Sequence, residues 1–184
     1  PTEQKKETVK ATVKSKAKEE TKLKFIAHTT SLKVGDKAPS FKEKNQDGKV
    51  ISLADFKGKN VILYFYPKDC TSGCTQEGKD FSENYKKFAS LNTIILGVSR
   101  DSLKLHKKFK TEQQFPFELL SDVDEKVCHL YSVLKEKMMY GKKTCGIERS
   151  TFLIDKQGIL CQEWRQVKVP GHVVAVLQAV AELS

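Results

Sequence analysis

The sequence predicts an α/β fold, in which a central mixed sheet carries helices on both faces. Two continuous apolar runs rich in β-branched and aromatic residues, 60–66 and 93–99, are typical of strands that are covered on both sides. Segments with helical spacing of apolar residues follow these runs, and the chain closes with two further strand-like segments and an apolar-faced helix. This order of elements indicates one sheet between helical layers.

Turn residues and spacing predict the elements around the first apolar run. Asp47-Gly48 stands between two short alternating segments and predicts a hairpin. The apolar run ends at Pro67. Beyond it, four residues at successive offsets of seven, four and three share one face of a predicted helix; they are Cys74, Phe81, Tyr85 and Phe88. This spacing places Cys74 in the first turn of the helix, on the side toward the core.

The second half of the chain continues the alternation of strands and helices. After the run 93–99, the predicted elements are a helix at 102–114 stopped by Pro116, a short helix within 121–134, a hairpin around Gln157-Gly158 and a helix after Pro170-Gly171. In the first of these helices Leu103, Leu105 and Phe109 partly follow helical spacing. A thioredoxin-like sandwich fits this order of elements and the length of 184 residues.

The N-terminal segment differs in composition from the rest of the chain. Residues 1–30 carry eight lysines against four glutamates and few large apolar residues, so they cannot bury enough surface to fold alone. We therefore predict a disordered, flexible, Lys-rich arm at 1–31 and a single thioredoxin-like domain at 32–184. The whole chain has a formal charge of +10, and this charge suggests that the basic arm makes weak contact with nucleic acid.

No apolar run approaches the roughly 18 residues that a membrane-spanning helix needs, and no secretory signal begins the chain. We expect a cytoplasmic protein, and the basic arm leaves the nucleus or an organelle open as alternatives. The five cysteines are an odd number in a chain that needs no disulfides to fold, which favours free thiols. They are Cys70, Cys74, Cys128, Cys145 and Cys161.

Cys74 has the position of a reactive cysteine. A thiol between a strand end and a helix start lies near unsatisfied backbone N–H groups and the positive end of the helix, which favour the thiolate. The Thr71 hydroxyl can hydrogen-bond to the sulfur or to a bound oxygen, Pro67 stiffens and shields the loop, and Gly73 lets backbone amides approach closely.

These residues also carry a family resemblance. The pattern Pro67-x-x-x-Thr71-x-x-Cys74 resembles the peroxiredoxin signature, and "FYPKDCTSGCTQEG" is similar to the subgroup called peroxiredoxin Q or bacterioferritin comigratory protein. The resemblance runs from Val34 to the C-terminal helix through "LGVSRDS", "LLSDVDEKV" and "YGKKTCGIERSTFLID".

The resemblance implies a thioredoxin fold and a thiol-dependent peroxidase of antioxidant defence. We also expect a monomer or dimer, with no cofactor and no metal. Such an enzyme reduces hydrogen peroxide and organic hydroperoxides to water and alcohols, and a thioredoxin-like protein or a small thiol restores it. By position, Cys74 is the peroxidatic cysteine, Thr71 orients the peroxide, Arg149 is the essential arginine and Pro67 shapes the loop. An arginine suits this role because its fork of donors can contact the thiolate and polarise the O–O bond together.

One departure from the subgroup concerns the recycling step. Many members have a second cysteine five residues after the peroxidatic one, where this chain has Lys79. Three routes stay open: a one-cysteine cycle with an external thiol, which we favour; resolution by Cys70, four residues before Cys74; and resolution by Cys145 or Cys128 after local movement. We also expect Cys128 and Cys161 to be packed thiols.

Two other functions compete with this reading. Cys70, Cys74 and His172 also resemble the copper site of SCO-type chaperones, since two thiolates and an imidazole suit copper, although His172 is expected at the surface. A nucleic-acid binder that uses the lysine arm is the second alternative, but no zinc spacing, aromatic RNA platform or helix-turn-helix pattern accompanies the arm.

Overall fold

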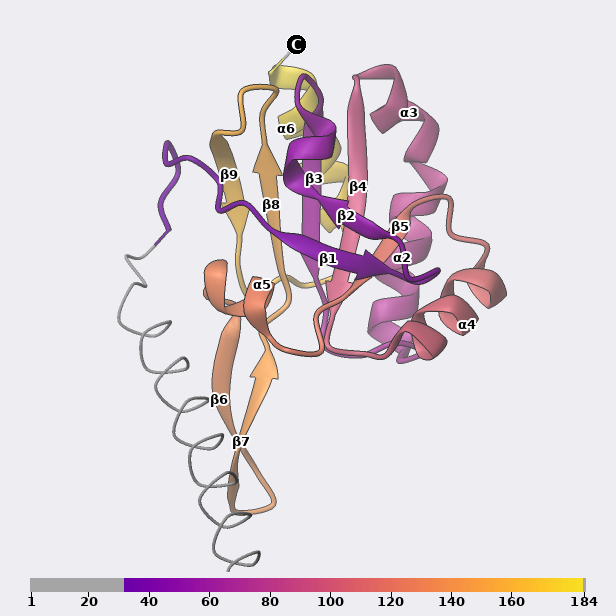
Figure 1. Cartoon of the computed structure of the whole chain (residues 1–184), viewed down its shortest axis with the longest axis vertical. Coiled ribbons are helices and arrows are strands. Elements are labelled where there is room, and N and C mark those ends of the chain that lie inside the picture. Colours follow the sequence, from indigo (N-terminus) through magenta and orange to yellow (C-terminus); the bar gives the residue numbers. More distant parts are fainter. Residues whose placement is uncertain (1–31, 184) are drawn as a thin grey trace, which may run out of the picture. The chain divides into compact units, whose positions relative to one another are not determined.

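A computed structural model describes residues 32–183 and confirms the α/β fold with a mixed sheet and helices on both faces (Figure 1). The predicted arm at 1–31 lies outside the described residues, so the proposed domain boundary stays a prediction. Among residues 32–183, no helix combines the length and the apolar character that crossing a bilayer requires.

The main sheet has seven strands in the order β2-β1-β5-β4-β3-β8-β9. Their bounds are β1 Lys42–Asn45, β2 Val50–Ser52, β3 Asn60–Phe65, β4 Thr93–Ser99, β5 Glu118–Ser121, β8 Ser150–Ile154 and β9 Leu160–Trp164. The two pairings of β4, with β3 and with β5, are parallel, whereas β8 runs antiparallel to β3. The predicted hairpins at Asp47-Gly48 and Gln157-Gly158 are both present.

Helices cover the two faces of this sheet and form two apolar cores. They are the short 3-10 helix η1 Leu53–Phe56 and the α-helices α2 Ser72–Glu83, α3 Tyr85–Ser90, α4 Leu103–Gln113, α5 Lys126–Leu130 and α6 His172–Glu182. One core includes residues of α5, and the other collects residues from α2, α3, α4 and α6.

Strand β3 supplies both cores because successive side chains of a strand point to opposite faces. Val61, Leu63 and Phe65 belong to the core on the α5 side, and Ile62, Tyr64 and Tyr66 to the other. Tyr66 is the residue that follows the strand. The chain therefore leaves the sheet on the face that α2 covers, and this brings Cys74 to that face.

The predicted helix that follows β3 is interrupted. Cys74, Phe81 and Phe88 are buried in one core and Tyr85 packs at its margin, but α2 ends at Glu83 and α3 begins at Tyr85. Between them, the Asn84 side chain donates to the Asp80 carbonyl oxygen at 2.9 Å. Asparagine competes for backbone hydrogen bonds in this way, which accounts for a break that apolar spacing did not reveal.

The expected apolar face of α4 needs a correction. Leu105 is 42% exposed, while His106 is fully buried beside Phe109. His106 and Phe109, three positions apart, form the inward face of the helix. The polar imidazole can be buried because both of its ring nitrogens have hydrogen-bond partners.

Three strands were not predicted. Strand β5 is only four residues long and follows Pro116 closely. Strands β6 Leu134–Met139 and β7 Lys142–Ile147 form a separate two-stranded ribbon that extends away from the main sheet in Figure 1. Most of the ribbon's side chains are exposed, so its sequence lacks the apolar alternation that marks a strand with one buried face.

Candidate active site

Cys74 lies in the first turn of α2, as predicted, and its side chain is almost completely covered, at 2% exposure. Thr71 is the N-cap residue, and the first hydrogen bond of the helix runs from the Thr75 N–H to the Thr71 carbonyl at 2.9 Å. The backbone N–H groups of residues 72–74 come before this first bond and therefore have no carbonyl partner within the helix. They place the positive end of the helix next to the sulfur.

Arg149 reaches Cys74 from a distant part of the sequence. Its Nη2 donates to the Cys74 Sγ across 3.4 Å. The sheet explains the approach: Ser150, the first residue of β8, is the register partner of Phe65, the last residue of β3. Arg149 therefore projects where β3 ends and the Cys74 loop begins.

Glu77 is a third member of this cluster, and the sequence reasoning missed it. It lies three residues after Cys74, on the same side of α2, and its carboxylate Oε2 accepts from Arg149 Nη1. Burial raises the pKa of Glu77 to about 7, against the opposing effect of the Arg149 guanidinium. Its Oε1 has no hydrogen-bond partner among the described residues. An acidic residue one helical turn from the thiol was the available signal.

The guanidinium of Arg149 thus donates to the Glu77 carboxylate through Nη1 and to the Cys74 sulfur through Nη2. Burial lowers the pKa of Arg149, but the Glu77 carboxylate and the Cys74 sulfur outweigh burial and raise it. Arginine stays charged at any relevant pH, and its planar fork holds both bonds in one geometry. The bond to the sulfur therefore comes from a permanently charged donor.

Gly73 makes room for the guanidinium. A Cβ atom at this position would lie 3.2 Å from Arg149 Nη2, closer than ordinary van der Waals contact. Gly73 was predicted to let backbone amides approach closely. In the structure, its missing side chain leaves space for the Arg149 side chain beside the first turn of α2.

Thr71 and Pro67 precede Cys74 by three and seven residues, and within residues 32–183 neither makes a hydrogen bond to the Cys74 sulfur. The Thr71 hydroxyl is exposed and donates to the Lys68 carbonyl oxygen at 3.0 Å, which leaves its oxygen lone pairs as acceptors. Pro67 is half-buried where the chain leaves the sheet. The substrate-orienting role of Thr71 stays a prediction.

The other cysteines differ sharply in exposure, and all five thiols are free. Cys128 is fully buried, as expected of a packed thiol, and burial raises its pKa far above the usual value. Cys161 is half-buried, and burial raises its pKa to about 11. Cys145 is exposed on β7.

Cys70 occupies an unusual backbone position beside the site. Its φ of 62° lies in the left-handed region that L-residues rarely adopt, and its side chain is exposed. Desolvation raises the pKa of the Cys70 thiol, and the carboxylates of Asp69 and Glu112 add to the effect. Its thiolate is therefore less available than that of an ordinary cysteine.

The residues of the copper alternative are not gathered. Among residues 32–183, one group of three potential metal ligands comes together, Asp69, Asp101 and His106, and it includes neither cysteine. His172 is buried, which corrects the expectation of a surface position, and its Nε2 lies 2.7 Å from the Thr151 Oγ1. Burial lowers the pKa of His172 to about 4, and nearby Arg149 acts in the same direction.

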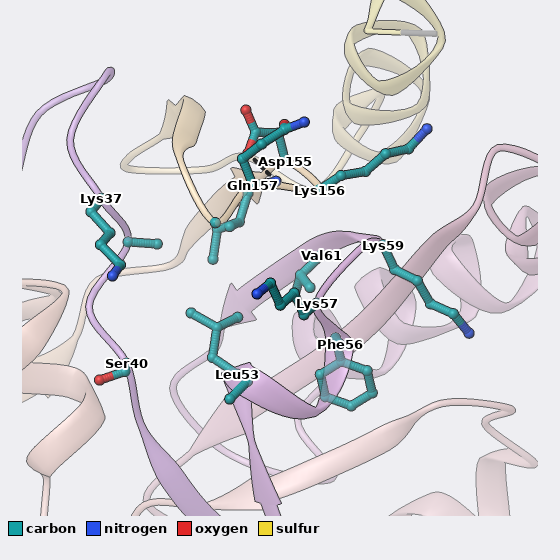
Figure 2. Close-up of a pocket in the computed structure, with 14 residues that line it drawn as sticks. Lys37, Ser40, Leu53, Phe56, Lys57, Lys59, Val61, Asp155, Lys156 and Gln157 are labelled. Atoms are coloured by element: carbon teal, nitrogen blue, oxygen red, sulfur yellow. Dashed lines mark hydrogen bonds between the residues drawn. The ribbon is translucent and has the colours of Figure 1, made fainter.

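Hollows lie both near and far from Cys74. An open groove of about 580 Å³ borders the first turn of α2 and is lined by Ser72, Gly73, Gln76, Asp80, Val169, Pro170 and Gly171. A second hollow of about 370 Å³, drawn in Figure 2, combines an apolar floor that includes Val61 with surrounding lysines such as Lys57. Because Val61 is near the start of β3 and Cys74 follows its end, the hollow in Figure 2 is separate from the thiol site.

Known proteins match nearly the whole described region. The profile of the AhpC/TSA family matches residues 34–162. Peroxiredoxin Bcp of Bacillus subtilis is 47% identical over 154 residues, which cover 84% of this chain and 98% of that protein. A putative peroxiredoxin bcp of Coxiella burnetii is 48% identical over 147 residues, 80% of this chain and 97% of that protein.

Solved structures agree with the sequence matches. A structure of Xanthomonas campestris peroxiredoxin Q has a TM-score of 0.77 and 45% identity, covering 83% of this chain and 96% of that one. A structure described as giving insights into the alkyl peroxide reduction activity of the Xanthomonas campestris bacterioferritin comigratory protein has a TM-score of 0.77 and 44% identity, covering 83% and 97% of the two chains.

Proposed function

The chain belongs to the AhpC/TSA family, as a thiol-dependent peroxidase of the peroxiredoxin Bcp type, and on this premise we propose that Cys74 is the residue oxidised by the hydroperoxide. Arg149 is proposed as the electrostatic partner of Cys74, Thr71 as the group that orients the peroxide, and Pro67 as the residue that shapes the loop. The substrates are hydrogen peroxide and organic hydroperoxides, and the role is antioxidant defence.

The reaction is a displacement at oxygen. The Cys74 thiolate attacks one peroxide oxygen, an S–O bond forms, and the O–O bond breaks. The sulfur is oxidised to sulfenic acid, and the leaving oxygen departs with the electron pair, takes up a proton, and is released as water or an alcohol. Negative charge develops on that oxygen, so a fixed cation close to the sulfur lowers the barrier.

The observation that carries this proposal is the 3.4 Å contact between the Arg149 Nη2 and the Cys74 Sγ. The second nitrogen of Arg149 is held by Glu77, so the guanidinium is oriented before a peroxide arrives. Preorganised donors of this kind are the largest single contribution to many enzymatic rate enhancements.

For the recycling step we propose a one-cysteine cycle with an external thiol. Lys79 is exposed on α2 at the position of a resolving cysteine, and Cys128 is fully buried in the core. The raised pKa of the Cys70 thiol leaves less thiolate to attack a sulfenic acid on Cys74. The reductant is proposed to be a small thiol or a thioredoxin-like protein. Cys70, which lies next to the site in sequence, is the second candidate.

Peroxide consumption with dithiothreitol tests the assignment of Cys74. We expect Cys74→Ser to abolish turnover and Cys161→Ser to retain it; unchanged turnover in Cys74→Ser would overturn the proposal. Mass spectrometry after one equivalent of peroxide separates the recycling routes. A trapped sulfenic acid at Cys74 without a disulfide supports the one-cysteine cycle, whereas a Cys70–Cys74 linkage identifies an internal resolver.

The role of Thr71 needs a pair of variants. Thr71→Val removes the hydroxyl and Thr71→Ser keeps it, so a slower peroxide step in the first and recovery in the second supports an orienting hydroxyl. Equal loss in both variants would instead point to packing of the threonine methyl group.

Location, assembly and the arm are further parts of the proposal. Five free cysteines support a reducing compartment, for which we propose the cytoplasm. We also propose that the protein is a monomer or a dimer. The charge of residues 1–30 supports weak, salt-sensitive contact with nucleic acid as an accessory property. Deletion of residues 1–30 should remove such contact and leave peroxide consumption intact.

A further inference from the structure

A buried hydrogen-bond network holds the loop between β3 and α2, just before Cys74. Its members, called here the Asp69 network, are Tyr66, Asp69, Asp101 and His106. The loop they hold leads directly into the first turn of α2, which carries the thiol.

The carboxylate of Asp69 is the centre of the network. Its Oδ1 accepts from the Tyr66 hydroxyl at 2.6 Å, and its Oδ2 lies 2.6 Å from His106 Nδ1. The Asp69 and His106 side chains are 1% and 0% exposed. A carboxyl group so deeply buried is stable only because both of its oxygens have partners.

Both ring nitrogens of His106 have hydrogen-bond partners. Its Nε2 lies 2.9 Å from the Leu120 carbonyl oxygen, which can only accept, so Nε2 carries a hydrogen. Its Nδ1 faces the Asp69 carboxylate at 2.6 Å. His106 belongs to α4, so this pair joins the loop to α4 and, through Leu120, to β5.

The loop backbone is held as well. The Asp69 N–H donates to Asp101 Oδ2 at 2.8 Å, and the same oxygen accepts from the Ser99 hydroxyl at 2.6 Å. The side chain and the main chain of Asp69 are therefore tied to β4, to α4 and to the segment between them.

Cys74 is consequently held from two sides. Arg149 contacts its sulfur from β8, and the Asp69 network holds the loop that leads to its helical turn. The thiol is only 2% exposed, so a reducing thiol can reach an oxidised Cys74 only if this turn moves. The contact with Arg149, in contrast, requires the turn to stay in place.

We propose that Asp69 and His106 are positioning residues that set the balance between the two half-reactions of Cys74. Their pair keeps the first turn of α2 against Arg149 for the reaction with peroxide, and it opposes the movement that exposes oxidised Cys74 to the reductant. Loosening the pair therefore slows the peroxide step and speeds the reduction step. This inference rests on the proposed role of Cys74.

The experiment measures the two half-reactions separately in a Cys70→Ser background, so that no disulfide to Cys70 contributes. Stopped-flow oxidation by one equivalent of hydrogen peroxide gives the first rate, and reduction of the oxidised protein by dithiothreitol gives the second. The variants are Asp69→Asn, His106→Gln and the milder Tyr66→Phe, which removes one hydroxyl donor.

A matched control is Asp122→Asn. Asp122 is also fully buried, and it accepts from the N–H groups of Val127 and Cys128 at 3.1 and 2.7 Å, on the α5 side of the sheet. This variant should lose stability like Asp69→Asn but keep both half-reaction rates of its parent.

For Asp69→Asn and His106→Gln we expect oxidation to slow and reduction to accelerate, each by about tenfold. A rate change of this size matches the net free energy of one hydrogen bond. Tyr66→Phe should shift both rates in the same directions by less, and it keeps the test usable if the other variants fail to fold. Unchanged rates, or rates that fall together as a general loss of structure would produce, overturn the inference. Oxidation in the parent that persists in Cys74→Ser would instead overturn the proposed function.

Discussion

Arg149 Nη2 lies 3.4 Å from Cys74 Sγ, although the two residues are 75 positions apart in the chain. The antiparallel pairing of β8 with β3 creates this contact, since it aligns Ser150 with Phe65. The sulfur therefore gains a fixed positive neighbour from the register of a sheet and the positive end of a helix from its own segment.

Replacement of Arg149 by lysine should slow peroxide reduction strongly. Arg149→Lys keeps the charge but cannot hold Cys74 and Glu77 with two fixed nitrogens, so we expect kcat/KM to fall about 100-fold, the typical cost of one transition-state donor. Steady-state peroxide consumption measures the effect. Arg165→Lys is the matched control, because Arg165 is also partly buried but contacts Ser132 and Tyr131 carbonyl oxygens; an equal loss there would contradict the assignment.

Glu77 should make the protein less stable as pH rises. Burial raises its pKa from 4.5 to about 7, so between these values the folded state binds more protons than the unfolded state. The stability linked to this proton is present below pH 4.5 and is lost as pH rises through 7. Urea unfolding of the wild type and Glu77→Gln from pH 4.5 to 7.5 should show the wild type losing stability relative to the variant. A constant difference across this range would refute the expectation.

His172 should act in the opposite direction. Burial lowers its pKa from 6.5 to about 4, so the unfolded state binds the extra proton as pH falls through this window. The stability associated with neutral His172 is present above pH 6.5 and decreases toward pH 4, by roughly 3 kcal/mol for a shift of this size. In His172→Gln this pH dependence should disappear, as measured by urea unfolding at pH 4.5 and 7. Persistence of the full pH dependence in the variant would mean that another group is responsible.

Gly73→Ala should separate activity from stability. The new Cβ would lie 3.2 Å from Arg149 Nη2 and displace the guanidinium, so we expect kcat/KM to fall about tenfold. The unfolding free energy should change little, since alanine favours a helix over glycine by about 0.5–1 kcal/mol and offsets the contact. Peroxide consumption and thermal unfolding are the two measurements.

The control for Gly73→Ala is Gly146→Ala on β7, where the nearest atom to a new Cβ lies 3.9 Å away on Lys137. We expect this variant to keep wild-type activity. A comparable loss of activity in both variants would show that the effect does not depend on Arg149.

Features that depend on neighbouring residues could be predicted from the sequence. The apolar runs that became β3 and β4 and the placement of Cys74 in a first helical turn follow from periodicity over a few residues. The exposed ribbon of β6 and β7 could not be predicted in this way, because a strand without a buried face leaves no apolar alternation in the sequence.

The sequence by itself determined the fold class, and it predicted Cys74 as the reactive cysteine and, through its resemblance to peroxiredoxins, Arg149 as the partner of Cys74. Only the tertiary structure decided that Glu77 holds that arginine and that His106, which no periodicity singled out, closes a buried pair with Asp69. The physical reason is that helix and strand periods come from local backbone geometry, whereas these contacts join segments 37 and 72 residues apart. Such contacts are set by strand register and helix packing, which spacing along the chain does not encode.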